Sequence, residues 1–218
     1  MIKAILFDLD GVLIETEQET FKFYQDYLKE KGINLKDSDF KYKAGRKSVD
    51  FWNDVLTYEQ IEVIDTKKLT ELKRDLFNTN PEKYVKKVAG GKELLSNLKK
   101  QGFKLALTTQ NEKRMADTSM DWLGIRNFFD VILSLQDITK KKPDPEIYLL
   151  TADKLNLNPS ECIVIEDSKD GVNSAKNANM ICIAFGHPYT PKGDLDNADI
   201  QIIRLNEITP KLIQNLSK

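Results

Sequence analysis

The sequence predicts an α/β fold in which helices cover both faces of a parallel sheet, with a helical domain inserted near the N-terminus. Three observations lead to this prediction. Short apolar runs alternate with amphipathic stretches in the second part of the chain, the first apolar run begins at residue 4, and residues 16–86 contain no convincing strand. Strands that alternate with helices at this spacing are typical of a parallel sheet with helical crossovers.

The expected strands are short, apolar and rich in β-branched residues. Such runs are typical of strands buried on both faces of a parallel sheet. The first strand is expected at residues 4–7, followed by strands at 104–108, 131–134, 162–165 and 181–185 and a weaker one at 200–203. The amphipathic stretches between them predict helices at 91–101, 112–123, 145–155 and 171–179.

The segment from residue 16 to residue 86 is dense in charge, and its apolar residues recur every three or four positions, as on a helix with one buried face. One predicted helix ends at Gly32 and a second ends near Asn80. Their apolar stripes are Phe21, Tyr24 and Leu28 in the first, and Leu69, Leu72 and Leu76 in the second. We therefore predict two domains, an α/β core formed by residues 1–15 and 87–218 and a helical domain formed by residues 16–86.

The composition limits the classes of partner. Charge is nearly balanced, with 33 Lys and Arg against 34 Asp and Glu, so no overall charge indicates binding to nucleic acid or to a membrane surface. The longest apolar run, residues 180–185, is far shorter than the roughly 20 residues that span a bilayer. The first strand begins too early to leave room for a signal peptide, and Cys162 and Cys182 lie in apolar runs that favour free buried thiols. We expect a soluble, cytoplasmic protein.

Two acidic residues, Asp8 and Asp10, come directly after the first predicted strand. Side chains two positions apart on a strand point to the same face, and Gly11 allows the chain to turn sharply after them. Two neighbouring carboxylates repel each other unless a cation lies between them, and Mg²⁺ prefers oxygen ligands. Taken alone, the pair also fits a surface turn with two solvated aspartates.

Polar residues follow the other predicted strands as well. The strand at 104–108 leads into Thr109, Gln110 and Asn111, which offer a hydroxyl group and backbone N–H groups. The strand at 162–165 leads into Glu166 and Asp167, and Lys142 precedes a predicted helix. Because parallel strands end at one edge of the sheet, where ligands bind in open α/β folds, we expect these side chains to meet. Acids, a hydroxyl, an ammonium group and a metal suit phosphoryl transfer to a carboxylate.

Four segments, residues 8–13, 107–109, 142–143 and 165–168, resemble in order and spacing the four motifs of the haloacid dehalogenase-like hydrolase superfamily. The helical insertion lies where members with a four-helix cap carry it. The chain is most similar to phosphatases of the phosphoglycolate phosphatase and β-phosphoglucomutase type. The resemblance implies a Rossmann-like catalytic core and a helical cap domain.

The resemblance also implies a role for each motif residue. Asp8 is the nucleophile that forms an aspartyl-phosphate, and Asp10 is the general acid and base. Thr109 and Lys142 bind the phosphoryl oxygens. The Mg²⁺ ligands are Asp8, the backbone carbonyl of Asp10, Asp167, and Glu166 directly or through water. Thr16, Gln110 and Asn111 are further candidates for contact with the substrate.

The segment at residues 42–49 is the candidate substrate-reading loop, because in related enzymes a loop between the first two cap helices reaches the site. Its Arg46 and Lys47 suit a carboxylate or a second phosphate of the substrate, and a solvated basic loop is the alternative. We expect a small phosphorylated substrate, no nucleic-acid or membrane partner, and a monomer or a homodimer.

Two other functions stay open at this point. A sugar-phosphate phosphomutase would share Asp8 and Asp10, but Thr20 stands where mutase-type members carry a histidine, and Glu15 replaces a more usual aspartate. Both departures favour hydrolysis. A catalytically silent binding protein would be expected to lack one of the motif carboxylates, and all are present. The lone His187, in a Gly-His-Pro sequence, is expected to be a loop residue.

Overall fold

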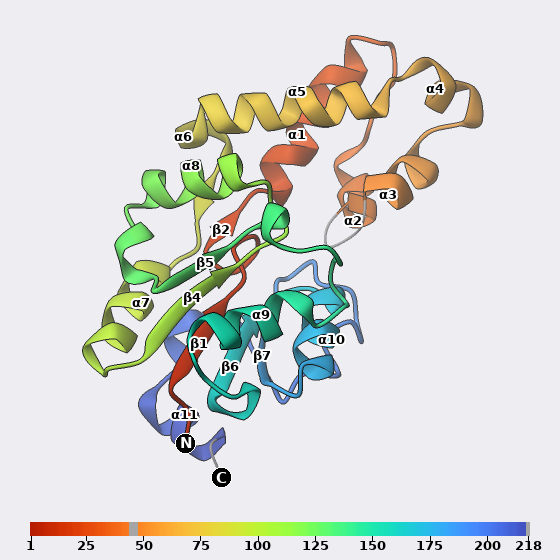
Figure 1. Cartoon of the computed structure of the whole chain (residues 1–218). Helices are drawn as coiled ribbons and strands as arrows, with labels where there is room; N and C mark the ends of the chain where they lie inside the picture. The colour runs from red at the N-terminus through yellow and green to blue at the C-terminus, as the bar shows by residue number, and fades with distance from the viewer. Residues whose placement is uncertain (44–47, 217–218) are drawn as a thin grey trace.

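The computed structural model describes residues 1–43 and 48–216, and the core of the described chain is a six-stranded sheet (Figure 1). All neighbouring strands in it are parallel, in the order β5-β4-β1-β6-β7-β8. The strands are β1 Ala4–Phe7, β4 Lys104–Thr108, β5 Val131–Leu133, β6 Cys162–Glu166, β7 Ile181–Phe185 and β8 Ile200–Ile202. The predicted parallel sheet is confirmed, and its strand boundaries agree with the prediction to within one residue.

Helices cover both faces of this sheet, as the alternating pattern predicts. Along β1, Phe7 packs in an apolar cluster with residues of α7, α8 and α11, whereas Leu6 packs in a second cluster with residues of α9 and α10. The helices are α7 Gly91–Lys100, α8 Lys113–Leu123, α9 Glu146–Lys154, α10 Lys169–Asn177 and α11 Pro210–Leu216. Short 3₁₀ helices occur at Asp37–Asp39, Arg126–Phe128, Leu135–Asp137, Pro159–Glu161 and Leu205–Glu207. Both predicted cysteine environments are confirmed, since Cys162 and Cys182 are free and buried.

A second, two-stranded sheet was not predicted. Strand β2 Ile14–Glu15 pairs antiparallel with β3 Lys86–Lys87, at the two points where the chain leaves the core and returns to it. Two residues are too few to show the alternation that identifies a strand, so the sequence carried no signal for this pairing. The consequence is that both connections to the helical segment run side by side.

The helical segment lies beyond the end of the sheet at which β1 finishes (Figure 1). Its own apolar cluster is built on aromatic residues, with the ring of Tyr24 centred 4.6 Å from Trp52 and 5.9 Å from Phe51. The segment consists of α1 Glu17–Lys29, α2 Phe40–Lys43, α3 Ser48–Val55, α4 Tyr58–Val63, α5 Thr66–Thr79 and α6 Pro81–Tyr84. Within the described ranges, no helix is both long and apolar enough to cross a membrane.

The buried face of α5 differs from the predicted stripe. Leu69 is buried as expected, but Leu72 is 42% exposed and Phe77 is buried in its place. At about 100° per residue, Phe77 lies about 80° round the helix from Leu69, and Leu72 lies about 60° away on the opposite side. The buried face of α5 is rotated away from the predicted stripe because Phe77 packs against the Tyr84 ring, with centroids 4.9 Å apart, and joins the apolar cluster of the core.

Candidate active site

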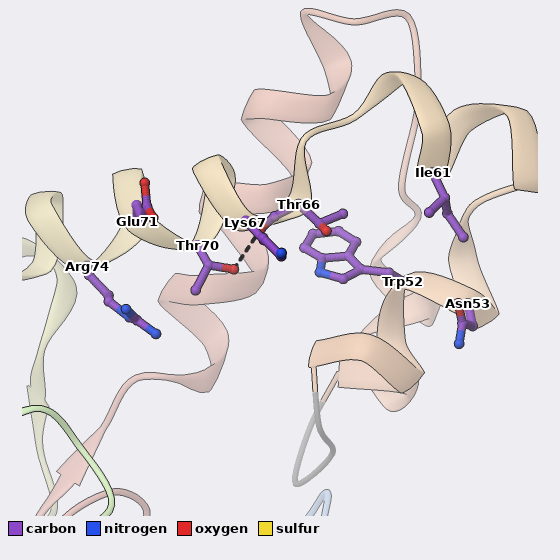
Figure 2. A pocket seen from close by; sticks show the side chains of 8 residues that line it. All are labelled: Trp52, Asn53, Ile61, Thr66, Lys67, Thr70, Glu71 and Arg74. Carbon is purple, nitrogen blue, oxygen red and sulfur yellow. Dashed lines mark hydrogen bonds between the residues drawn. The ribbon is translucent and has the colours of Figure 1, made fainter. Parts of the chain in front are cut away.

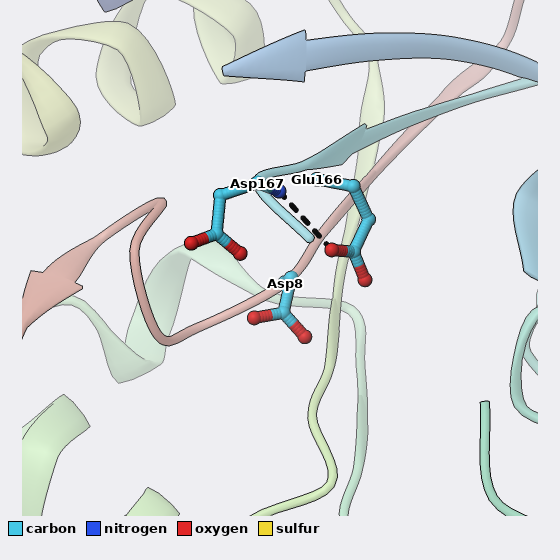
Figure 3. Close-up of side chains that lie close together, drawn as sticks. All are labelled: Asp8, Glu166 and Asp167. Atoms are coloured by element: carbon cyan, nitrogen blue, oxygen red, sulfur yellow. Dashed lines mark hydrogen bonds between the residues drawn. The ribbon is translucent and has the colours of Figure 1, made fainter. Parts of the chain in front are cut away.

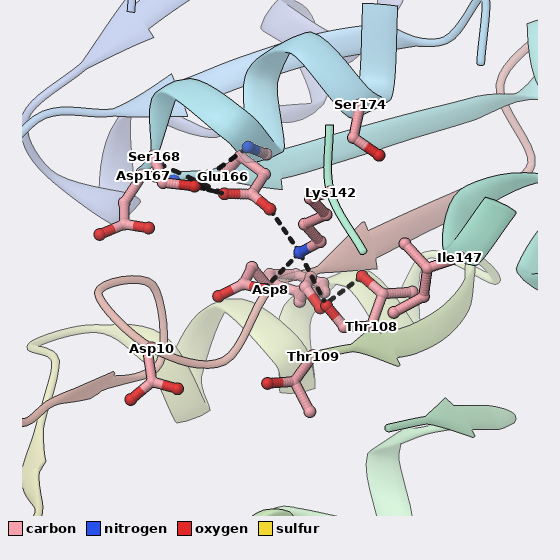
Figure 4. Close-up of polar contacts among 12 residues, drawn as sticks. Asp8, Asp10, Thr108, Thr109, Lys142, Ile147, Glu166, Asp167, Ser168 and Ser174 are labelled. Atoms are coloured by element: carbon pink, nitrogen blue, oxygen red, sulfur yellow. Dashed lines mark hydrogen bonds and ion pairs between the residues drawn. The ribbon is translucent and has the colours of Figure 1, made fainter. Parts of the chain in front are cut away.

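The polar residues predicted to meet at the strand ends do converge there. Asp8 follows β1, Thr109 follows β4, Glu166 ends β6, and Lys142 comes from the loop before α9. All four residues are buried, with exposed fractions between 0% and 8%. Figure 4 shows their side chains gathered beyond the ends of these strands. The parallel arrangement brings them together because β1 lies between β4 and β6 in the sheet.

The Lys142 ammonium group is the centre of this arrangement. Its Nζ atom lies 2.6 Å from Asp8 Oδ1, 2.5 Å from Glu166 Oε1 and 3.2 Å from the carbonyl oxygen of Thr108 (Figure 4). Burial by itself lowers the pKa of Lys142, but the charges of Asp8 and Glu166 outweigh burial and raise this pKa above its ordinary value. The side chain is therefore a charged donor whose three N–H groups all have acceptors.

Glu166 is held on both of its carboxylate oxygens. Oε1 accepts hydrogen bonds from Lys142 and from the Tyr148 hydroxyl, the latter at 2.7 Å. Oε2 accepts from the Ser168 hydroxyl and from the backbone N–H of Asp167, both at 3.1 Å. Burial raises the pKa of Glu166, but Lys142 and these other donors more than offset burial and lower it. Glu166 is thus an ionised and firmly oriented group.

Asp10 also has a defined set of partners. The Thr16 hydroxyl donates to Oδ1 over 3.2 Å, and the Asn111 side-chain amide donates to Oδ2. Burial raises the pKa of Asp10, although the positive charge of Lys73 on α5 opposes the shift. Thr16 and Asn111, both predicted to contact substrate, therefore orient Asp10 in this structure, and a substrate contact through either residue stays a prediction.

Three carboxylates form a cluster that suits a divalent cation. One ligand oxygen from each of Asp8, Glu166 and Asp167 lies within 4.8 Å of the others (Figure 3). Burial raises the pKa of Asp8 to about 8, with Lys142 opposing and Glu166 adding to the shift. Burial and the charges of Glu166 and Asp8 also raise the pKa of Asp167 well above its usual range. A divalent cation would relieve this repulsion, and oxygen ligands are those that Mg²⁺ prefers.

Glycine at two positions allows the acidic cluster to be so compact. A Cβ atom on Gly11, whose φ is +70°, would lie 1.8 Å from Asp167 Oδ2. A Cβ atom on Gly171 in α10 would lie 1.9 Å from Glu166 Cδ. Any larger residue at either position would displace a carboxylate of the cluster.

A cavity of about 590 Å³ opens onto these residues. It is lined by Asp8, Asp10 and Lys142 of the core and also by Glu17 and Asp50 of the helical segment. Thr109, Gln110, Asn111, Ser168, Lys169, Asp167, Asp170 and Asp194 complete the lining. Arg46 and Lys47, the predicted substrate-reading pair, lie outside the described residues.

A second cavity, of about 330 Å³, lies within the helical segment (Figure 2). Figure 2 shows the Trp52 indole beside the first turns of α5. Two of the polar groups around it are engaged within the protein: the Thr70 hydroxyl donates to the Thr66 carbonyl over 2.8 Å, and Arg74 donates to Glu112 of the core over 2.6 Å. This cavity contains none of the predicted site residues.

Two side-chain contacts near the site were not predicted from the sequence. Tyr148 lies on the buried face of α9, where a tyrosine hydroxyl needs a partner, and only the fold reveals that the partner is Glu166. His187 is a loop residue, as expected, but its Nε2 donates to the Gly11 carbonyl over 2.8 Å and so supports the turn after Asp10. Its ring stacks on Tyr189, whose hydroxyl donates to Glu15.

Most of the chain matches a known family. Residues 5–185 match the family model of the haloacid dehalogenase-like hydrolases. The chain belongs to this family. It is 32% identical to a putative phosphatase, YhcW, of Bacillus subtilis (strain 168), over 87% of this chain and 86% of that protein. It is 31% identical to a phosphorylated carbohydrates phosphatase of Thermotoga maritima, over 82% of each chain.

The fold of this family is also seen in a solved relative. The crystal structure of a putative β-phosphoglucomutase from Thermotoga maritima superposes with a TM-score of 0.77 and 27% identity, over 98% of this chain and 99% of that one. The haloacid dehalogenase-like fold is therefore confirmed. With relatives named as phosphatases, the protein is an enzyme of the phosphoric monoester hydrolase class.

Proposed function

We propose that the protein is a Mg²⁺-dependent phosphatase that hydrolyses a small phosphomonoester through an aspartyl-phosphate on Asp8. The observation that carries this proposal is the buried Lys142 ammonium group, which bridges Asp8 and Glu166 in the cavity that Asp10 also lines. This group orients the Asp8 carboxylate and offers positive charge where phosphoryl oxygens would gather during transfer.

The reaction has two steps, in which Asp8 is first the nucleophile and then the leaving group, and Asp10 is first the general acid and then the general base. In the first, an Asp8 oxygen bonds to phosphorus, the bond from phosphorus to the leaving oxygen breaks, and Asp10 gives that oxygen a proton. In the second, Asp10 takes a proton from water as the water oxygen attacks phosphorus, and the bond to Asp8 breaks to release phosphate. The raised pKa of Asp10 suits it to carry that proton. Acid–base help of this kind contributes about 10²–10⁴-fold.

Asp8, Asp167 and the Asp10 backbone carbonyl would hold Mg²⁺, with Glu166 contributing directly or through water. The donors already on Glu166 favour the contact through water. When bound, the ion supplies positive charge that keeps the carboxylates ionised and offsets charge on the phosphoryl group.

Residues 16–86 are proposed to form a cap over the core, which comprises residues 1–15 and 87–218. Glu17 and Asp50 of this segment line the cavity above Asp8, which supports a role in enclosing the substrate. Thr109 is proposed to bind the phosphoryl group, and Thr16, Gln110, Asn111, Arg46 and Lys47 to contact the substrate. The substrate is a small phosphorylated molecule, and the name of the Thermotoga maritima phosphatase makes phosphorylated carbohydrates the first class to test.

The phosphomutase alternative is supported by the likeness to the putative β-phosphoglucomutase of Thermotoga maritima. Against it, Thr20 occupies the helix position where mutase-type members carry a histidine, and it is 2% exposed. Incubation with β-glucose 1-phosphate separates the two activities. Release of phosphate without formation of glucose 6-phosphate supports the phosphatase, and isomerisation without release supports the mutase.

The central test is the Asp8→Asn variant, assayed with Mg²⁺ on a panel of sugar phosphates, phosphoglycolate, nucleotides and pyrophosphate. The wild-type enzyme should release phosphate from at least one of these, and Asp8→Asn should lose this activity while retaining a cooperative melting transition. An Asp8→Asn variant with full activity contradicts the nucleophile assignment. A wild-type protein inactive on the whole panel favours the silent binding protein instead.

A further inference from the structure

The Tyr148 hydroxyl contacts the same Glu166 oxygen as Lys142 does. Tyr148 is the third residue of α9 and has no exposed surface. Its hydroxyl lies 2.7 Å from Glu166 Oε1, and Lys142 Nζ lies 2.5 Å from that same atom and 5.1 Å from the centre of the Tyr148 ring. Burial and the nearby carboxylates raise the pKa of Tyr148 well above its usual value, so it remains a hydrogen-bond donor.

The contacts of Lys142 impose a constraint on phosphoryl transfer. Its three N–H groups already have three acceptors, on Asp8, Glu166 and Thr108. To stabilise a phosphoryl oxygen in the transition state, one N–H must turn away from an acceptor. The Asp8 contact orients the nucleophile. The Thr108 contact is the longest of the three, but Glu166 Oε1 is the acceptor that keeps a second side-chain donor, the Tyr148 hydroxyl, when Lys142 turns away from it. An ionised, buried oxygen left without a donor is strongly unfavourable.

We propose that Tyr148 is a positioning residue that keeps Glu166 Oε1 hydrogen-bonded while Lys142 turns toward the transferring phosphoryl group. This role rests on the proposed phosphatase function and adds a residue to it. Tyr148 touches neither substrate nor the reacting atoms, and it acts through Lys142. It lowers the energy of the transition state more than that of the resting enzyme, because only the transition state needs the second donor.

The other oxygen of Glu166 separates this role from a purely structural one. Oε2 is anchored by Ser168 and by the backbone N–H of Asp167, so Glu166 stays in place when the Tyr148 hydroxyl is removed. Loss of the hydroxyl therefore affects mainly Oε1, the atom shared with Lys142. The expected consequence is a lower kcat with substrate binding almost unchanged.

The test compares Tyr148→Phe with Tyr24→Phe, after the activity of the wild-type enzyme has been established with Mg²⁺. Tyr24 is a matched control because it is equally buried, at 1% exposure, but lies in the apolar cluster of the helical segment. Tyr148→Phe should lower kcat by about 10- to 100-fold, which corresponds to about 1.4–2.7 kcal/mol, with KM within about threefold of wild type. Tyr24→Phe should leave kcat within about twofold of wild type.

Inhibition constants give a second readout that a merely structural role would not move. Vanadate resembles the five-coordinate transition state, so Tyr148→Phe should weaken its inhibition by a factor similar to that for kcat, with inorganic phosphate little affected. Melting temperatures of both variants identify any loss that comes from misfolding.

Two results would overturn the role of Tyr148 in an active enzyme. One is a kcat within twofold of wild type. The other is a parallel loss of kcat, phosphate affinity and melting temperature, which indicates a structural residue. A wild-type enzyme without phosphatase activity would instead reject the proposed function, and the role of Tyr148 with it.

Discussion

Removal of divalent metal should make the stability of this protein fall as pH rises from about 5 to about 8. In the metal-free site, burial raises the pKa of Asp8 from 3.8 to about 8. Between these two values the folded protein holds a proton that the unfolded chain has lost, so rising pH favours unfolding. The stability that comes from the Asp8 proton is fully present below pH 3.8 and is lost as pH rises toward 8. Above pH 8, titration of Asp8 no longer changes the stability. Asp167 shifts in the same direction, for the same reason.

The size of this effect follows from the linkage relation. One proton retained only by the folded state lowers the free energy of unfolding by about 1.4 kcal/mol per pH unit, or about 4 kcal/mol between pH 5 and pH 8. In a chain of this length, each kcal/mol shifts Tm by about 2–4 °C, so Tm should fall by about 10 °C over this range. Surface carboxyls such as Glu146 and Glu161 have lowered pKa values and titrate below this window, so they do not mask the effect.

Added Mg²⁺ should cancel this trend, because it must displace the proton from Asp8. Free metal at about 100 times Kd stabilises the folded state by about 2.7 kcal/mol. With metal in excess of Kd, this gain shrinks by about 1.4 kcal/mol for each pH unit below the Asp8 pKa. The assay is a set of thermal melts from pH 5 to pH 8, in EDTA and in Mg²⁺, with the gain in Tm largest at pH 8.

Asp167→Asn is the matched control for this prediction. The amide removes one of the repelling charges, so the metal-free variant should melt above metal-free wild type at pH 8, and it should respond little to Mg²⁺. A metal-free wild-type Tm that stays constant or rises from pH 5 to pH 8 would refute the reasoning. So would an Asp167→Asn variant that Mg²⁺ stabilises as strongly as it does wild type.

Two further variants test the packing around the site and the loop at 42–49. Gly171→Ala places a methyl group 1.9 Å from Glu166 Cδ, so it should lower the free energy of unfolding by about 1–3 kcal/mol, measured by urea denaturation, and should reduce kcat. Unchanged activity would show that Glu166 can move freely. Arg46→Ala should lower kcat/KM on the natural substrate by about tenfold or more, about 1.4 kcal/mol, and should affect p-nitrophenyl phosphate much less. Equal losses on both would place Arg46 near the transferring phosphoryl group, and no loss on either would indicate a solvated loop.

The local sequence was sufficient to predict the sheet and the residues at its carboxyl ends. The apolar run before Asp8 is four residues long, and its side chains are buried on both faces of a parallel sheet, as its composition requires. Strand order follows from the β-α-β pattern only in part, but the pattern alone places every strand end on one edge. The meeting of Asp8, Lys142 and Glu166 could therefore be predicted although Asp8 and Lys142 are 134 positions apart.

Other features depended on how the elements pack, and local patterns carry no information about that. The pairing of β2 with β3 and the turned face of α5 arise from contacts with the core, which a window of sequence does not contain. The same holds for the His187 contact with Gly11, across 176 positions. In the sequence, Tyr148 simply occupies one of the apolar positions of a predicted helix. Only the tertiary structure brings its hydroxyl to Glu166, because a buried polar group takes whichever partner the surrounding packing leaves within reach.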